Sequence, residues 1–402
     1  MNVSLRGGAL VAAMCLAQVA NLLSHVAVPA VMAQHLIPAW GLSASEAGVM
    51  AGAYSIGYML AVPVLMTLTD RTDARLILLA GSTLMGTATI AFGVLAEGFV
   101  SATALWALSG IGCAGAYMPG LRALTDRLGA GDHSRSITLY TACFSLGVGL
   151  SFLSTQVIAQ VWGWRWAFYV TGATPIVTIC ICAMLPPAWP TPTAGGGWAM
   201  GRVWRNRTAM GYVLGYGVHC FELYGLRTWL VAFWSYVAAR NGGSAILEPV
   251  MVSVLFTLLA VPASVLGNES ALRVGRHRSI SWVQICSALV GLAIGLCISL
   301  PPAVLLALVL AYAFTLPGDS GALTSGMTQS ASTADKGATM AMHSMVGFGM
   351  AAAGGTLVGI ALDAAGGPAS DSGWTAAFLV MASGIALGPL ALAWSRRAAA
   401  TN

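Results

Sequence analysis

The chain has 402 residues, of which 57% are hydrophobic and only 8% are charged, and its formal net charge is +5. A soluble domain carries about 25% charged residues, so this composition excludes an ordinary soluble protein and predicts one that crosses a membrane several times. The small positive charge gives no support to nucleic-acid binding, because the basic residues lie in short segments between apolar runs.

Twelve apolar runs, separated by short polar breaks, follow one another along the chain. Each is long enough to cross the hydrocarbon core of a bilayer as a helix. The first run is too long for the core of a signal peptide, so we interpret it as a retained span. The predicted spans are residues 8–34, 47–67, 76–97, 100–121, 136–160, 166–186, 209–238, 247–267, 279–299, 302–327, 338–362 and 374–395.

The basic residues predict how these spans are oriented. Of the 18 Lys and Arg residues, all except Arg165, Arg227 and Arg240 fall on one side of the predicted membrane. Segments rich in Lys and Arg stay in the cytoplasm. Both termini are therefore expected there, in a multi-pass protein of the bacterial inner membrane.

The longest polar break runs from Pro186 to Thr208 and is rich in proline, glycine and arginine. Proline and glycine end helices and form linkers. The break therefore predicts three regions, which are an N-terminal six-helix bundle at 1–186, a cytoplasmic linker at 187–208 and a C-terminal six-helix bundle at 209–402.

The two predicted bundles resemble each other in sequence. Three short segments recur in the same order at similar offsets, which indicates a duplicated six-helix unit. The pairs are Val62-Pro63 with Val261-Pro262, residues 116–120 with 313–318, and residues 163–168 with 373–378.

The segment between the second and third spans carries a family motif. Residues 66–75 read MTLTDRTDAR. With the twelve spans and the repeat, this segment resembles the major facilitator superfamily, whose motif is a glycine, three residues, Asp-Arg, one residue, a glycine and basic residues. Met66 and Asp73 stand where the family has its glycines. The resemblance implies an all-α membrane protein with twelve transmembrane helices in two pseudo-symmetric six-helix bundles, and a cytoplasmic gate at Asp70, Arg71 and Arg75.

Two other motifs of the family are eroded. Trp106 stands where the family usually has an arginine in the fourth span. Drug/proton antiporters usually carry Gly-Pro in the fifth span, where this chain has Gly147-Val148. The second departure disfavours a drug/proton efflux antiporter, which remains the alternative function.

The seventh span is apolar but carries ionisable residues near its middle. A charged side chain at that depth costs about 2.5–3.5 kcal/mol on insertion scales, so it is rarely present without a function. Glu222 and Arg227 follow His219 by three and eight residues, and Tyr216 precedes it by three. On a helix these side chains fall within about 140° of one another, whereas Tyr224 lies outside this arc. We interpret Glu222 as an acid that takes and releases a proton, and Arg227 as a group that holds a substrate carboxylate or extends to the outer interface.

Further candidates lie in the first, fourth and tenth spans, which the resemblance implies line a central path with the seventh. They are Asn21 and His25, Tyr117, and Asp319. Pro317-Gly318, immediately before Asp319, predicts a helix break that suits a polar site. The alternative role for Asp319 is to cap the half-helix that follows it.

The sequence carries no phosphate-binding loop, metal-ligand cluster or nucleophile motif, which indicates transport driven by a gradient and no cofactor. We predict a secondary active transporter, not an enzyme, that moves a small polar or anionic organic solute by alternating access as a proton-coupled symporter. An integral-membrane enzyme and a receptor with a transport fold are less favoured. We expect a monomer whose partners are the substrate, protons and the lipid bilayer. The predicted substrate-binding residues are Asn21, His25, Tyr117, Tyr216, His219, Arg227 and Asp319, and the predicted proton-coupling residues are Glu222, His219 and Asp319.

Overall fold

A computed structural model describes residues 5–128, 134–189, 200–243, 246–332 and 335–399. Every regular element in these ranges is a helix. Contacts divide the chain into two compact units. Unit 1 contains Met1–Val31 and Ala53–Gly196, and unit 2 contains Met32–Gly52 and Gly197–Asn402.

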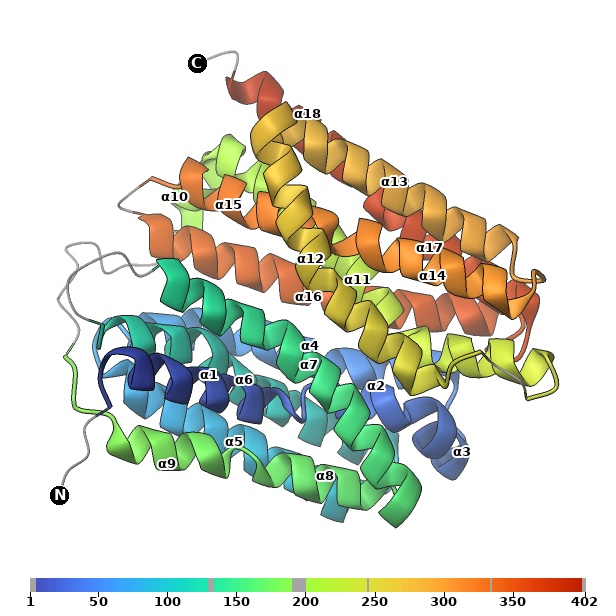
Figure 1. Cartoon of the computed structure of the whole chain (residues 1–402), viewed down its shortest axis with the longest axis horizontal. Helices are drawn as coiled ribbons and strands as arrows, with labels where there is room; N and C mark the ends of the chain where they lie inside the picture. Colours follow the sequence, from blue (N-terminus) through green and yellow to red (C-terminus); the bar gives the residue numbers. More distant parts are fainter. Residues whose placement is uncertain (1–4, 129–133, 190–199, 244–245, 333–334, 400–402) are drawn as a thin grey trace. The chain divides into compact units, whose positions relative to one another are not determined.

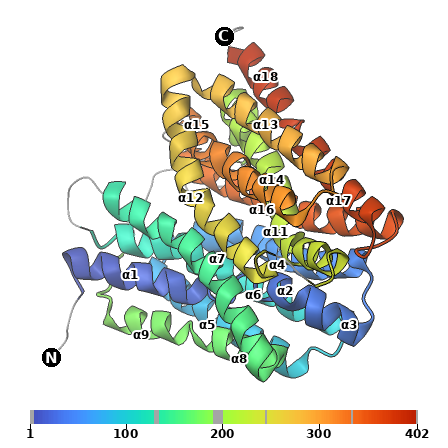
Figure 2. The same ribbon diagram turned by 45° about the vertical axis from the view of Figure 1, so that its right-hand side comes forward.

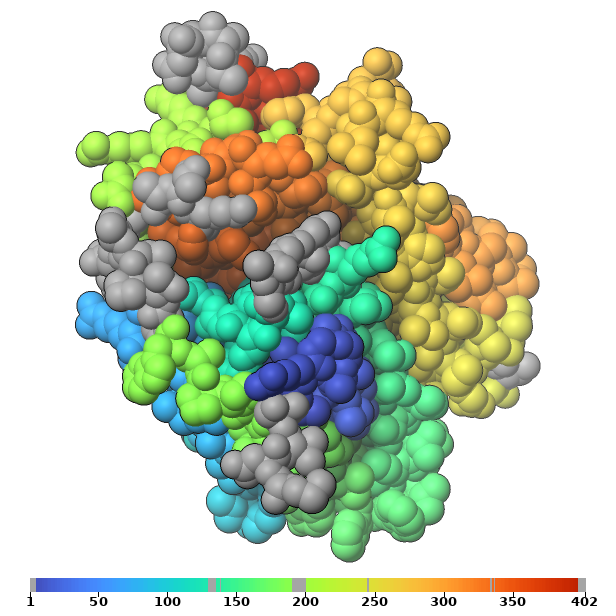
Figure 3. All heavy atoms as spheres, turned by 60° about the vertical axis from the view of Figure 1, so that its left-hand side comes forward, coloured from blue at the N-terminus to red at the C-terminus, as the bar shows by residue number. Residues whose placement is uncertain are grey.

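Unit 1 is a bundle of long helices that lie side by side (Figure 1). Helix α4 (Ala44–Leu68) begins in unit 2 and continues into unit 1. The other helices of unit 1 are α1 (Gly7–Leu22), α2 (Ala27–Val31), α5 (Ala74–Leu95), α6 (Phe99–Thr125), α7 (Ser134–Trp162), α8 (Trp164–Ala173) and α9 (Ile176–Met184). Figure 3 shows the dark blue α1 at the surface beside the teal α7, with which it packs.

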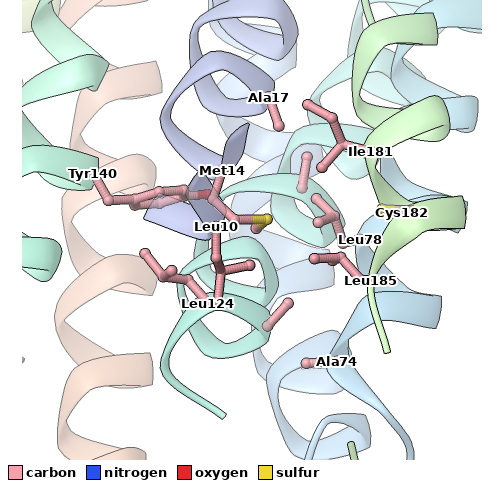
Figure 4. Close-up of a cluster of buried hydrophobic side chains, with 12 residues drawn as sticks. Leu10, Met14, Ala17, Ala74, Leu78, Leu124, Tyr140, Ile181, Cys182 and Leu185 are labelled. Carbon is pink, nitrogen blue, oxygen red and sulfur yellow. The ribbon is translucent and has the colours of Figure 1, made fainter. Parts of the chain in front are cut away.

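One apolar core of unit 1 lies among α1, α5, α6, α7 and α9 (Figure 4). Leu10, Met14 and Ala17 point into it from one face of α1, at helical spacings of three and four residues. The Tyr140 ring enters from α7, and Leu185 follows the end of α9. This core fixes the end of α9 against the rest of unit 1.

Unit 2 contains the remaining helices, of which α12, α13 and α14 pack together (Figure 2). Helix α11 contacts α16 along much of its length, and also α15, α17 and α18. The helices are the π-helix η1 (Met32–Leu36), α3 (Ile37–Trp40), α4 (Ala44–Leu68), α10 (Met200–Arg205), α11 (Arg207–Arg240), α12 (Pro249–Val274), α13 (Arg276–Leu296), α14 (Pro302–Thr315), the 3-10 helix η2 (Leu316–Asp319), α15 (Ser320–Ser330), α16 (Lys336–Ala364), α17 (Asp371–Ile385) and α18 (Gly388–Ala399).

The start of α4 packs on α16 within unit 2. Gly48 approaches so closely that an added Cβ would lie 2.6 Å from the carbonyl oxygen of Gly355. The Asp363 carboxylate accepts hydrogen bonds from the backbone N–H groups of Ala44 (2.9 Å) and Ser45 (2.7 Å). These N–H groups have no acceptor within their own helix, so Asp363 caps α4 from α16.

The predicted spans correspond to these helices. Ten described helices are long and apolar enough to cross a membrane, or up to eleven if the bent pair Gly7–Leu22 and Ala27–Trp40 is one span. Helix α11 is not among the ten, because its polar residues lower its mean hydropathy. The predicted linker, 187–208, includes α10 and the first residues of α11, whereas residues 190–199 lie outside the described ranges. The limits of the three predicted regions stay predictions.

The tenth span is broken where Pro317-Gly318 predicts a break. The α-helix α14 ends at Thr315, the tighter helix η2 carries Pro317 and Gly318, and α15 begins at Ser320. By contrast, α6 continues through Pro119, the equivalent proline of the first repeat. The break leaves Asp319 at the junction of η2 and α15, with its side chain 1% exposed.

Candidate functional site

Asp319 forms the centre of a buried polar group in unit 2. Its Oδ1 lies 2.7 Å from Nδ1 of His219 on α11, at ion-pair distance but without the alignment of a hydrogen bond. Its Oδ2 accepts a hydrogen bond of 2.8 Å from Nε2 of Gln284 on α13. Although Asp319 occupies the N-cap position of α15, its side chain makes no capping hydrogen bond. The geometry therefore favours the polar-site interpretation over the capping role.

Glu222 belongs to a second buried group one turn along α11. Its side chain is 0% exposed and accepts hydrogen bonds from two hydroxyl groups. Ser287 on α13 donates at 3.0 and 2.9 Å, and Tyr312 on α14 donates at 2.7 Å. The carboxylate is thus satisfied by neutral donors. The acidic partner of His219 is Asp319 rather than Glu222.

Tyr216 connects His219 to a second histidine. Its ring stacks on His219 with centroids 5.6 Å apart and on His343 of α16 with centroids 3.8 Å apart. His343 is buried and its Nε2 lies 3.4 Å from the hydroxyl of Thr324 on α15. The polar face of α11 therefore meets α15 and α16 as well as α13.

Arg227 lies on the same helix, two turns beyond His219, and is 6% exposed. Its guanidinium carbon lies 4.9 Å from the centroid of the Tyr224 ring, which is a cation–π contact. Among the described residues no acid pairs with Arg227 and no acceptor bonds its side chain, and its Nε is sealed from solvent. It is a buried charge without a counter-charge.

The candidates of unit 1 have partners within that unit. His25 Nδ1 is 3.1 Å from the Tyr54 hydroxyl, and its ring also meets Phe144 edge-on. The Tyr117 ring packs against Phe144 at 5.1 Å. Asn21 accepts a hydrogen bond of 3.0 Å from the Thr178 hydroxyl through its side-chain oxygen, while its buried Nδ2 has no partner among the described residues. The structure thus brings His25 and Tyr117 together around Phe144.

The predicted gate residues differ in their contacts. Asp70 pairs with Arg122 of α6 at 3.2 Å, and Arg122 also bonds Asp126. Arg71 is exposed and forms no ion pair among the described residues. Arg75 donates a hydrogen bond of 2.6 Å to the carbonyl of Leu185. All of these contacts lie within unit 1.

Asp73, at a motif glycine position, is the most strongly paired acid of this segment. It receives two hydrogen bonds of 2.7 Å from Arg127, with both side chains at most 6% exposed. It also accepts from the backbone N–H of Arg75 and of Ala188, while Arg127 donates to the carbonyl of Pro186. The Asp73–Arg127 pair therefore joins the end of α6 to the chain that leaves α9.

We expect Asp73→Asn to lower the melting temperature of unit 1, because breaking one half of a buried ion pair costs about 3–5 kcal/mol. Burial raises the pKa of Asp73, but the hydrogen bonds from Arg127, Ala188 and Arg75 and the charge of Arg127 lower it, so the net pKa lies below its usual value. A lowered pKa gives stability that is complete above the ordinary aspartate pKa of about 3.9 and is lost as the pH falls through the folded-state pKa. The difference in melting temperature between wild type and variant should accordingly be constant near neutral pH and shrink below about pH 4. An unchanged melting temperature at neutral pH would show that this pair contributes nothing.

Several residues of the site were not predicted. Gln284, Ser287 and Tyr312 surround the two acids, and Gln18 on α1 accepts a hydrogen bond of 2.8 Å from Tyr140. The sequence of α13 does contain a pattern that could have identified two of them, because Gln284 and Ser287 are three residues apart and share one face of an apolar span. Tyr312 carries no such signal, because a tyrosine in an apolar run is also a common packing residue.

Comparison with known proteins identifies the family of this chain. The sequence profile of the Major Facilitator Superfamily matches residues 14–355. The chain belongs to this superfamily. Membership makes it a membrane transport protein with a small-molecule substrate. A comparison with curated proteins finds no match.

Solved transporter structures share the fold. The nucleoside transporter NupG matches with a TM-score of 0.74 at 13% identity, over 96% of this chain and 99% of its own. A POT family transporter in complex with 5-aminolevulinic acid matches with a TM-score of 0.77 at 11% identity, over 98% and 99%. A bacterial homologue of the human lysosomal transporter Spinster, inward-facing and occupied, matches with a TM-score of 0.72 at 16% identity, over 98% and 96%. These likenesses concern the fold alone, and they confirm the predicted all-α membrane fold of twelve helices in two bundles.

Proposed function

We propose that this chain is a proton-coupled secondary active transporter that moves a small polar or anionic organic solute across the bacterial inner membrane by alternating access. The observation that carries the proposal is the His219–Asp319 pair, whose side chains are 2% and 1% exposed and 2.7 Å apart. Both lie on elements of predicted membrane spans, where an ionisable pair is costly and usually functional. Histidine is the side chain that changes charge near neutral pH, so such a pair is suited to gain and lose a proton.

The other candidate residues receive roles in the same proposal. Glu222 is a second acid that takes and releases the proton. Tyr216 and Arg227 in unit 2, and Asn21, His25 and Tyr117 in unit 1, bind the substrate. Asp70, Arg71 and Arg75 form the cytoplasmic gate. We further infer that a single copy is active, with both termini and the linker in the cytoplasm.

The proposal is tested with purified protein in sealed vesicles that enclose a pH-sensitive dye. Organic acids, amines and hydrophobic drugs are added outside, one at a time. A transported solute should acidify the lumen as protons enter with it, whereas protons leaving the lumen would indicate the alternative antiport. Solute entry without any proton movement would contradict proton coupling.

A substitution of His219 tests whether the proton flux depends on the His219–Asp319 pair. We expect His219→Gln to reduce the solute-dependent proton flux at least about tenfold, because Asp319 loses the imidazole with which it can exchange a proton. His277→Gln is the matched control, since His277 is also in unit 2 but contacts Tyr212 outside this pair. Equal proton fluxes in wild type and His219→Gln would exclude the pair from coupling.

A further inference from the structure

Arg227 is a buried charge of α11 that pairs with none of the residues that the structure describes. Arginine stays protonated at any physiological pH, so it cannot avoid the cost of burial by losing its charge. Buried charges are normally paired, because desolvation of an isolated ion is expensive. In the described residues the Arg227 side chain has no ion pair and no hydrogen bond, and it makes a cation–π contact with the Tyr224 ring.

The two buried acids, Asp319 and Glu222, have the polar partners that Arg227 lacks. Asp319 has His219 and Gln284, and Glu222 has the hydroxyls of Ser287 and Tyr312. Neither acid forms an ion pair with Arg227 in the described residues. Its guanidinium is therefore open to a partner that the chain itself does not supply.

We propose that Arg227 binds the carboxylate of a monoanionic organic substrate, an inference that rests on the proposed transport function and narrows its substrate class. The contact with Tyr224 uses no N–H group of the guanidinium as a hydrogen-bond donor to a described residue, so these groups remain to donate hydrogen bonds. A carboxylate accepts two parallel N–H bonds from such an edge. One uncompensated positive charge is balanced by one negative charge, which favours a monocarboxylate over a phosphate dianion.

The first test measures the melting temperature of the purified full-length protein with benzoate, lactate, benzamide, lactamide and inorganic phosphate. A ligand that binds the folded protein raises the melting temperature according to its concentration and Kd. We expect at least one of the two carboxylates to raise it, with no shift from its neutral amide. A shift with phosphate alone, or equal shifts with an acid and its amide, would overturn the proposal.

The variants assign the response to one side chain. Arg227→Gln should abolish the carboxylate shift, and Arg227→Lys should weaken carboxylate affinity roughly tenfold, because lysine keeps the charge but loses the planar fork. Arg240→Gln is the matched control, since Arg240 lies on the same helix but pairs with Asp371. It should respond to the carboxylates as the wild type does. A carboxylate shift that persists in Arg227→Gln would contradict the assignment.

The ligand-free melting temperature separates a binding role from a structural one. Removal of an unpaired buried charge should leave the melting temperature of Arg227→Gln equal to that of the wild type or raise it. A structural arginine would instead give a clear loss of stability in the same variant. That loss, together with no carboxylate response in the wild type, would make Arg227 a structural residue and overturn the proposal.

Failure of this inference is distinguishable from failure of the proposed function, because binding is measured at equilibrium without any gradient. Carboxylate binding that depends on Arg227, with no proton movement in vesicles, would leave this inference standing and refute proton coupling. Proton movement with a neutral solute, and no carboxylate binding, would refute this inference alone.

Discussion

Glu222→Gln should keep substrate-for-substrate exchange and lose accumulation driven by a pH gradient. A glutamine has nearly the shape of a protonated glutamate, and its oxygen accepts from Tyr312 or Ser287 while the hydroxyl of the other rotates to accept from its NH2 group. The variant should therefore fold, but its side chain can no longer gain and lose a proton. Exchange needs no net proton movement, whereas accumulation does.

The expected size of this effect follows from the energy of the gradient. One pH unit is worth about 1.36 kcal/mol per proton, which supports about tenfold accumulation if one proton moves with each substrate. We expect this ratio in wild-type vesicles and a ratio near one in Glu222→Gln, measured with one radiolabelled solute that the wild type accumulates. Glu248→Gln, which changes an exposed glutamate just before α12, should behave as the wild type.

Two outcomes would change the assignment of the coupling acid. If Glu222→Gln still concentrates the solute, Glu222 is not that acid. Asp319 then remains as the proposed coupling acid, because it is the acid that contacts His219. Loss of both exchange and accumulation would instead indicate that Glu222 holds α11 to α13 and α14 and is needed for the fold.

Local sequence was sufficient to predict the polar face of α11 and the break in the tenth span. Both features depend on local effects. The polar face follows from the helical period, and the break follows from the inability of Pro317 to continue a regular helix. The sequence also predicts that His219, Glu222 and Arg227 lie deep in the membrane. The apolar run around them is long enough to span the bilayer, and they lie near its middle.

The partners of these residues were not predictable in the same way. Helical spacing suggested that His219 and Glu222 would act together, but the side chains of α11 point outward to different neighbours. His219 meets Asp319 beyond the break in the tenth span, and Glu222 meets Ser287 and Tyr312. These contacts depend on how segments that are distant in the sequence pack together. Neutral partners such as serine and tyrosine are common in apolar spans, so a single sequence does not single them out.

The contact of α4 with α16 is a second example of long-range information. The sequence predicts that the second span begins at residue 47, and the apolar character of this span says nothing about which helix its start meets. In the structure residues 44–52 belong to unit 2, with Asp363 capping the first N–H groups of α4. Gly48 and Gly355 allow α4 and α16 to approach closely, but only the structure shows that these two glycines face each other.

The close approach of α11 and α16 predicts a loss of stability within unit 2. A Cβ added at Gly354 would lie 2.0 Å from the carbonyl oxygen of Phe221 and 2.9 Å from its carbonyl carbon. These are backbone atoms, so the helices themselves must separate, and Glu222 directly follows the displaced peptide. Trp229 also bonds the carbonyl of Gly355 at 2.9 Å, which ties the same turn to α11. We expect Gly354→Ala to lower the melting temperature and to weaken substrate binding together.

The sizes of two opposing effects decide whether Gly354→Ala stabilises or destabilises the protein. Alanine gains about 1 kcal/mol over glycine within a helix, whereas overpacking that moves backbone costs about 1–3 kcal/mol or more. At a contact of 2.0 Å the second effect should win, for a net loss of about 2 kcal/mol. Gly337→Ala in the first turn of the same helix α16 is the control, since a Cβ there meets nothing within 4 Å. It should leave the melting temperature unchanged or raise it slightly. If Gly354→Ala is as stable as Gly337→Ala, then α11 and α16 do not pack as closely as described here, and the arrangement of Tyr216 against His343 would have to be revised with them.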